Sequence, residues 1–173
     1  LFIGKKIEEN QNNYEIEFCQ NYSHRCFTRC YGFVETKGKI SMILYEFMCN
    51  GSLYDIKNKL NELYSFTIMN RIFEGIEYLH SNSLIHRDIK PDNILIDHDY
   101  KAYISDFETI RKINNFDDEM TFGFGNNKYA SPEQLKGGKI SFQTDIYSFA
   151  LTVYYLFAKE DLFQTNDLDL ILQ

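Results

Sequence analysis

The segment from 86 to 93, His-Arg-Asp-Ile-Lys-Pro-Asp-Asn, constrains the fold of this chain more than any other feature. It gathers two basic, two acidic and one amide side chain within eight residues. The chain has only two prolines, and Pro91 is one of them. Because proline cannot donate a backbone hydrogen bond and interrupts helices, the segment is predicted to be a polar loop.

An apolar stripe precedes this loop. Ile68, Ile72, Ile76 and Leu79 recur every three or four residues, which predicts an amphipathic helix over about 66–80. Upstream, Ser52 is a helix-capping residue type and predicts a separate helix that runs to about Leu63.

The remaining elements are short strands and helices. Apolar runs rich in β-branched or aromatic residues predict short strands, and less polar stretches with helical spacing predict helices. The predicted strands are 31–35, 40–46, 94–96 and 102–104, and the other predicted helices are 14–22 and about 143–159. Strands come first, then helices with a small hairpin between them, which predicts an α+β fold in a single domain.

Composition excludes some classes of protein. The net charge is −7 and no basic run is present, so nucleic acid and anionic membrane are unfavourable partners. The longest nearly apolar stretch, 148–158, is too short to span a bilayer, and residues 1–10 lack a signal-peptide pattern. The four cysteines match no zinc-binding spacing, which predicts reduced thiols in a cytoplasmic protein: Cys19, Cys26, Cys30 and Cys49.

The loop from 86 to 93 resembles the catalytic loop of eukaryotic-type protein kinases. The resemblance implies that Asp88 accepts or orients the hydroxyl proton of a substrate, and that Lys90 reaches the transferred phosphate. Asn93 would supply a neutral oxygen ligand to Mg²⁺. Lysine at position 90 resembles the Ser/Thr kinases rather than the tyrosine kinases.

The tripeptide Asp106-Phe107-Glu108 resembles the kinase Asp-Phe-Gly motif. By this resemblance Asp106 would ligate Mg²⁺ at the ATP phosphates, and Phe107 would pack under a helix of the smaller lobe. Glu108 departs from the motif, since glycine adds no charge and adopts backbone angles that glutamate avoids. Two alternatives remain open: the carboxylate lies near the phosphate site, or it points outward and has no effect.

The segment Ile43-Leu44-Tyr45-Glu46-Phe47-Met48 resembles the kinase hinge. The resemblance makes Tyr45 the gatekeeper, pairs adenine with the backbone of Glu46 and Met48, and includes Leu95 among the nucleotide-binding residues. The following Asn-Gly-Ser-Leu, together with Lys90, resembles the tyrosine-kinase-like group of Ser/Thr kinases.

The N-terminal residues carry no Gly-rich phosphate loop. Lys5, with Lys6 as the alternate, is the candidate for the lysine that grips the phosphates. Glu15 suits the glutamate that pairs with this lysine in kinases. The alternative is that Lys5 and Glu15 are two solvated surface charges.

The segment Tyr129-Ala-Ser-Pro-Glu133 resembles the end of a kinase activation loop. Within that loop, Thr121 is a candidate phosphorylation site whose phosphate Arg87 would bind, and the alternative is an ordinary loop threonine. Asn126 stands where Ser/Thr kinases usually have threonine. The arginine that usually pairs with Glu133 has no counterpart among the residues that follow it, which predicts an unpaired carboxylate.

Asp145 begins a segment that resembles the central helix of the kinase C-lobe. The resemblance implies that its carboxylate accepts hydrogen bonds from the catalytic-loop backbone, because a buried carboxylate needs such partners. Its expected role is to hold Asp88 in place.

Taken together, the resemblance implies a two-lobe fold with a truncated β-rich N-lobe and a mainly helical C-lobe. Residues 1–48 would form the N-lobe remnant and hinge and residues 49–173 the C-lobe of one kinase domain that is incomplete at both ends. The implied function is transfer of the ATP γ-phosphate to a protein Ser or Thr, with Mg²⁺. A catalytically impaired pseudokinase that acts as a binding or scaffold module is the alternative, and a small-molecule phosphotransferase is disfavoured by the Ser-Pro-Glu segment.

Overall fold

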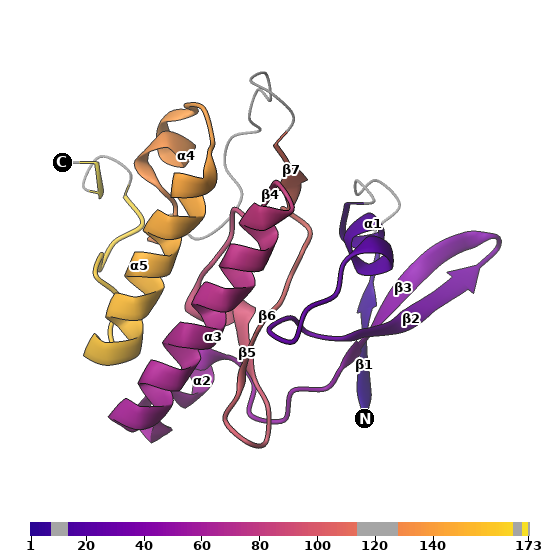
Figure 1. The fold of residues 1–173 in the computed structure, drawn as a ribbon, viewed down its shortest axis with the longest axis horizontal. Helices are drawn as coiled ribbons and strands as arrows, with labels where there is room; N and C mark the ends of the chain where they lie inside the picture. The colour runs from indigo at the N-terminus through magenta and orange to yellow at the C-terminus, as the bar shows by residue number, and fades with distance from the viewer. Residues whose placement is uncertain (8–13, 114–127, 168–170, 173) are drawn as a thin grey trace.

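A computed structural model describes residues 1–7, 14–113, 128–167 and 171–172 of the 173-residue chain. Figure 1 shows a small strand-rich part with one helix beside a larger, mainly helical part. This arrangement confirms the predicted α+β class.

The small part is built on a three-stranded antiparallel sheet in the order β1-β3-β2. Its strands are β1 (Phe2–Lys6), β2 (Cys30–Thr36) and β3 (Lys39–Glu46). The central strand β3 contributes the buried residues Ile43 and Tyr45, and the helix α1 (Tyr14–Asn21) packs Ile16 against them. Lys5 pairs with Ile43 in the register, so β1 places the lysine next to this small core.

The larger part contains two long helices. The helices α3 (Glu62–Ser81) and α5 (Phe142–Ala158) lie side by side (Figure 1). The predicted stripe of α3 is buried, with Ile68, Ile72 and Ile76 at most 1% exposed. These residues join Tyr155 and Leu156 of α5 in the main hydrophobic core, whose burial is the chief stabilising contribution.

Two short antiparallel pairs hold the polar loop of residues 86–93. The strand β4 (Leu84–Ile85) precedes the loop and pairs with β7 (Arg111–Lys112). The short helix η2 (Pro91–Asn93) closes it, and β5 (Ile94–Ile96) follows and pairs with β6 (Ala102–Ile104). The loop is therefore fixed at both ends by strands, and β6 delivers the next segment, Asp106 to Glu108, beside it.

The helix predicted from Ser52 to about Leu63 is wrong in its length. The helix α2 spans only Leu53–Ile56 and is followed by the short helix η1 (Lys57–Lys59). A new helix, α3, begins at Glu62, where the Asn61 side chain accepts a hydrogen bond of 2.9 Å from the Tyr64 amide. Asn61 is an N-cap that the sequence analysis missed, and an N-cap starts a new helix because it satisfies amides that have no partner within it.

The short helix α4 (Pro132–Lys136) precedes α5 in the chain. Ser131 caps it and Gly137 ends it in the left-handed conformation. Among the described residues, no helix combines the length and apolar character that a membrane crossing needs.

Candidate active site

Asp145 holds the backbone of the 86–93 loop. Its carboxylate is fully buried and accepts hydrogen bonds from the backbone amides of His86 (2.9 Å) and Arg87 (2.8 Å). The His80 Nε2 atom of α3 lies 2.9 Å from the same carboxylate. The expected contact between Asp145 and the loop is confirmed, and the carboxylate joins α3, α5 and the loop at one point.

Asp88, Lys90 and Asn93 lie together, as the resemblance implied. Asp88 Oδ2 accepts hydrogen bonds from Lys90 Nζ (2.7 Å) and from Asn93 Nδ2 (2.8 Å). Asn93 Nδ2 also donates to the Asp88 carbonyl at 2.9 Å, which closes the loop on itself. In the part of the chain that the structure describes, both side-chain donors bind Oδ2, so Oδ1 is the Asp88 oxygen open to a further proton donor.

Lys5 lies at the centre of a second cluster. Its Nζ atom is 2.9 Å from Glu15, 2.8 Å from Asp106 and 2.7 Å from Glu108. Lys5 rather than Lys6 thus makes the ion pair with Glu15. Glu108 does not point outward: its carboxylate lies in the same cluster.

The electrostatics of this cluster favour the charged forms. Burial by itself lowers the pKa of Lys5, but the carboxylates of Glu15, Asp106 and Glu108 outweigh it and raise that pKa above its ordinary value. Burial by itself raises the pKa of Asp106, yet the hydrogen bond and charge of Lys5 outweigh it and lower that pKa. Lys5 therefore stays protonated and Asp106 ionised at neutral pH.

Ser105 links the two clusters. Its amide and its hydroxyl each donate to the Asn93 carbonyl at 2.9 Å, which fixes Asp106, the next residue, beside Asn93. Asp106 adopts a left-handed backbone conformation, with φ of 63°, at this turn. The Asp106 carboxylate and the Asn93 amide oxygen are hard oxygen donors of the kind that Mg²⁺ prefers, so the residues present fit that ion.

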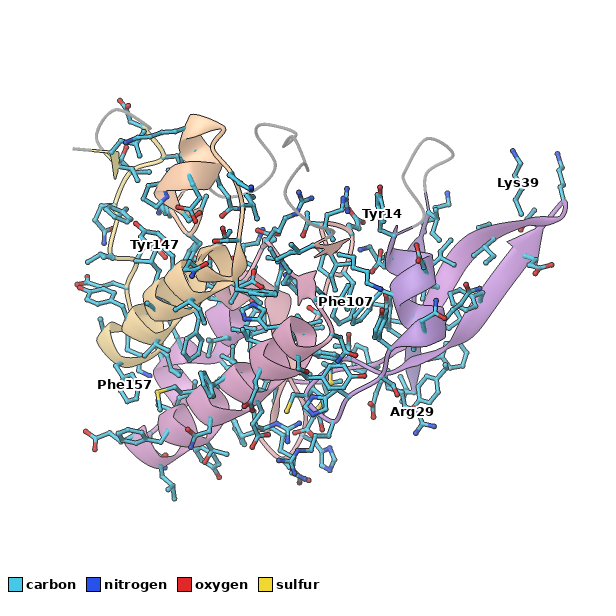
Figure 2. All side chains as sticks on the ribbon, turned by 45° about the horizontal axis from the view of Figure 1, so that its top comes forward. Tyr14, Arg29, Lys39, Phe107, Tyr147 and Phe157 are labelled. Atoms are coloured by element: carbon cyan, nitrogen blue, oxygen red, sulfur yellow. The ribbon has the colours of Figure 1, made fainter. Side chains whose placement is uncertain are left out.

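Phe107 is buried under α1, as expected. Its ring is stacked on Phe18 of α1 at 4.2 Å between centroids, and it lies 5.5 Å from Phe27 and 5.8 Å from His86. Figure 2 shows Phe107 at the junction of the strand-rich and helical parts. This aromatic column fixes α1, and hence Glu15, relative to the 86–93 loop.

Tyr45 contacts α1 through its hydroxyl group. The hydroxyl donates to Glu15 Oε1 at 2.7 Å, and Cys19 Sγ lies 3.1 Å from the Tyr45 hydroxyl oxygen. Burial raises the pKa of Tyr45, and the neighbouring Cys19 thiol and Glu15 carboxylate raise it further, so the hydroxyl keeps its proton and remains a donor. The gatekeeper prediction placed Tyr45 at the nucleotide site but did not foresee this bond.

The other predicted nucleotide-binding residues lie along the connection between the two parts. The Glu46 amide donates to the Arg29 carbonyl at 2.8 Å, and the Met48 carbonyl accepts from the Gly51 amide at 3.1 Å. Leu95 forms an isolated bridge with Ser52, just beyond this connection. Tyr45, Glu46 and Met48 therefore follow one another into this connection, and Leu95 of β5 meets it at Ser52.

Gln134 is a site residue that the sequence analysis missed. Its Nε2 atom donates to the Arg87 carbonyl at 2.8 Å, while its Oε1 accepts from the Ser131 amide at 3.0 Å. The side chain thus connects the N-terminus of α4 to the 86–93 loop. The Ser-Pro-Glu-Gln spacing of a capping box was the available signal.

The prediction that Glu133 lacks a partner is wrong. Thr144 Oγ1 donates to Glu133 Oε1 at 2.8 Å, and Thr144 is fully buried at the start of α5. A hydroxyl of the first turn of α5 is therefore the partner of Glu133, in place of the arginine that has no counterpart here. The predicted roles of Thr121 and Asn126 fall on residues outside those that the structure describes.

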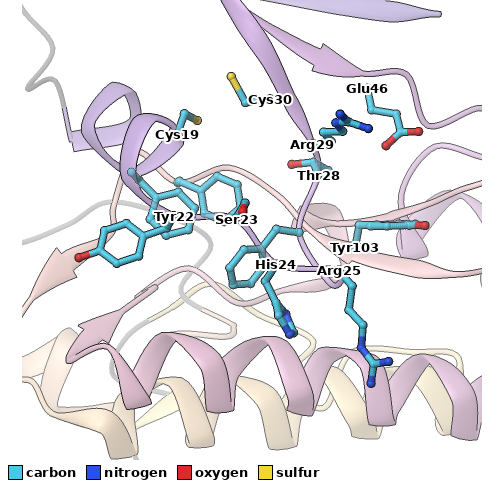
Figure 3. A pocket seen from close by; sticks show the side chains of 13 residues that line it. Cys19, Tyr22, Ser23, His24, Arg25, Thr28, Arg29, Cys30, Glu46 and Tyr103 are labelled. Carbon is cyan, nitrogen blue, oxygen red and sulfur yellow. The ribbon is translucent and has the colours of Figure 1, made fainter.

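A separate cavity of about 750 Å³ is lined by the end of α1, by residues between 22 and 30 and by Tyr103 of β6. Figure 3 shows Cys19 and Tyr22 on one side of it and Arg29 and Glu46 on the other. It reaches the aromatic column at Phe107, but Asp88, Lys90, Asn93 and Asp106 do not line it. This cavity is therefore distinct from the two polar clusters.

Comparison with known proteins identifies relatives of this arrangement. The family model described as "Protein kinase domain" matches residues 3–172. The chain is 34% identical over 147 residues to a maternal embryonic leucine zipper kinase of Danio rerio, which covers 82% of the chain. It is 36% identical over 146 residues, 80% of the chain, to mitogen-activated protein kinase kinase 1c of Physcomitrium patens.

A third relative is a probable LIM domain-containing serine/threonine-protein kinase of Dictyostelium discoideum, 32% identical over 162 residues and 91% of the chain. The chain spans 22% of the zebrafish protein, 42% of the moss protein and 25% of the Dictyostelium protein. It therefore corresponds to a minor part of each of these longer proteins.

Proposed function

The chain belongs to the protein kinase domain family, and from that membership we propose that the protein transfers the γ-phosphate of ATP to a Ser or Thr hydroxyl of a protein substrate. The observation that carries the proposal is the convergence of Asp88, Lys90 and Asn93 in one hydrogen-bonded cluster. Ser105 ties this cluster to Asp106 and so to Lys5.

Each side chain has a chemical task in this proposal. Asp88 Oδ1 orients the attacking hydroxyl and accepts its proton, while Lys90 places a positive charge where the transferred phosphate arrives. Lys5, fixed by Glu15, binds the nucleotide phosphates. Phosphoryl transfer needs chiefly positioning and countercharge, and these residues supply both.

Asp106 and Asn93 would hold Mg²⁺, which neutralises phosphate charge when bound. Adenine would pair with the backbone of Glu46 and Met48, between Tyr45 and Leu95. These assignments are supported by the hard oxygen donors and by the short stretch that connects the two parts of the fold.

The kinase group and the cellular compartment of the protein are also proposals. We place it in the tyrosine-kinase-like group of Ser/Thr kinases, supported by the Asn-Gly-Ser-Leu segment at 50–53 and by Lys90. We place it in the cytoplasm, supported by four cysteines that are free thiols.

The test is phosphorylation of Ser/Thr peptide libraries by the full-length protein with Mg-ATP. The Asp88→Asn variant is expected to lose activity by at least about a hundredfold, because the general base contributes on this scale. Asp99→Asn, in the exposed turn between β5 and β6, is the matched control and should retain activity. Binding of Mg-ATP without any transfer by the wild-type protein would refute the proposal and favour the scaffold module.

A further inference from the structure

All three donors of the Lys5 ammonium group face carboxylates. A lysine ammonium has three N–H donors. Glu15, Asp106 and Glu108 each lie within 2.9 Å of the Lys5 Nζ atom, and Glu108 is the nearest of them at 2.7 Å. A nucleotide phosphate that binds Lys5 must therefore replace one of these carboxylates.

Glu15 is the partner least able to leave. It is only 6% exposed, and it also accepts the hydrogen bond from Tyr45. Removing its carboxylate from Lys5 would leave a buried charge without its ammonium partner, which costs free energy. Asp106 is held next to Asn93 through Ser105 and is the acidic metal ligand of the proposed site.

Glu108 is the partner that can be displaced. Its side chain is 38% exposed, as is that of Asp106, but Glu108 is not the proposed metal ligand, so its carboxylate can become hydrated without the cost of remaining buried alone. The segment around it is nevertheless kept close to the small part of the fold, since Arg111 stacks on the Tyr14 ring of α1 at 3.6 Å. The Glu108 carboxylate therefore stays near Lys5 and exchanges readily with another anion.

We propose that Glu108 occupies the position on Lys5 that a nucleotide phosphate takes, and that it thereby weakens ATP binding. This inference rests on the proposed function, because it assumes that Lys5 binds ATP phosphates. Charge acts in the same direction: three carboxylates surround one ammonium, and the surplus negative charge repels the triphosphate. Glu108 is thus a built-in competitor that sets the ATP concentration at which the site fills.

The experiment compares ATP and adenosine binding by calorimetry at fixed Mg²⁺ for the wild-type chain and the Glu108→Gln variant. Glutamine keeps the size of the side chain and removes its charge. ATP should bind about tenfold more tightly to the variant, since one charge-assisted contact no longer competes. Adenosine, which has no phosphate, should bind both proteins equally.

Matched variants separate the competing explanations. Glu77→Gln, an exposed position of α3, should leave ATP affinity unchanged, whereas Glu108→Gly should tighten it as Glu108→Gln does. In a Lys5→Met background, Glu108→Gln should tighten ATP binding clearly less than in the wild-type chain, because the shared partner is gone and only the repulsion between Glu108 and the triphosphate is relieved.

If Glu108→Gln binds ATP no more tightly than the wild-type chain, the inference is overturned. The proposed function still stands in that case, provided that the wild-type chain binds ATP and adenosine. Failure of every variant to bind either ligand would instead overturn the nucleotide site, and the inference with it.

Discussion

The Tyr45 hydroxyl and the Glu15 carboxylate are joined by a hydrogen bond of 2.7 Å that links the central strand β3 to α1. Glu15 is almost fully buried and lies between this hydroxyl and the Lys5 ammonium. The position of α1 therefore depends on a tyrosine hydroxyl as well as on the familiar pairing of lysine with glutamate.

Replacing Tyr45 with Phe should loosen α1. The change leaves the Glu15 carboxylate without its hydroxyl donor, and a hydrogen bond to a charged group contributes about 2 kcal/mol. We expect a loss of this order in the free energy of unfolding, measured by urea denaturation, and faster amide exchange in α1. Tyr31→Phe, at an exposed ring, is the control; an equal loss in both variants would contradict the role of the Tyr45 hydroxyl.

Replacing Asp145 with Asn should destabilise the catalytic loop. Asparagine has one acceptor oxygen for the two amides of His86 and Arg87, and its own NH₂ group would face a donor. Breaking a fully buried, charged contact costs about 3 kcal/mol. The free energy of unfolding should fall by this amount, whereas Asp99→Asn, at a surface ion pair, should change it by less than about 1 kcal/mol.

Replacing Thr144 with Val tests the hydroxyl that pairs with Glu133. Valine keeps the shape of threonine but leaves the partly buried Glu133 carboxylate without this donor. A loss of about 1–2 kcal/mol is expected in the free energy of unfolding. Thr67→Val is the control: its exposed hydroxyl donates to the Leu63 carbonyl in its own helix, so the change should have little effect, and matching losses would count against the contact.

Acid should weaken the contact between Asp161 and the 128–129 segment. Burial alone raises the pKa of Asp161, but hydrogen bonds from Lys128 and Tyr129 outweigh it and lower that pKa below its ordinary 3.8. Because the folded-state pKa is the lower one, the contribution to stability is complete above 3.8 and disappears as pH falls through the folded value.

The free energy of unfolding should therefore fall further between about pH 6 and pH 3 for the wild-type chain than for Asp161→Asn. Parallel pH profiles for the two proteins would show that Asp161 contributes nothing at neutral pH.

Local patterns predicted most of the secondary structure. The stripe Ile68, Ile72, Ile76 predicted α3, and the runs 94–96 and 102–104 predicted β5 and β6 with their observed bounds. The predicted length of α2 was wrong because Asn61 caps a second helix and does not continue the first. The residue types alone do not show where one helix ends and the next begins.

The sequence by itself determined the family and the residue types of the site, because phosphoryl transfer needs specific charges at fixed spacing and Asp88, Lys90 and Asn93 lie within one loop. Only the tertiary structure decided what is distant in the chain: that Lys5 rather than Lys6 meets Glu15, that Glu108 turns toward Lys5, and that Thr144 serves Glu133. Each of these contacts depends on how separate elements pack, and packing arises from the whole core.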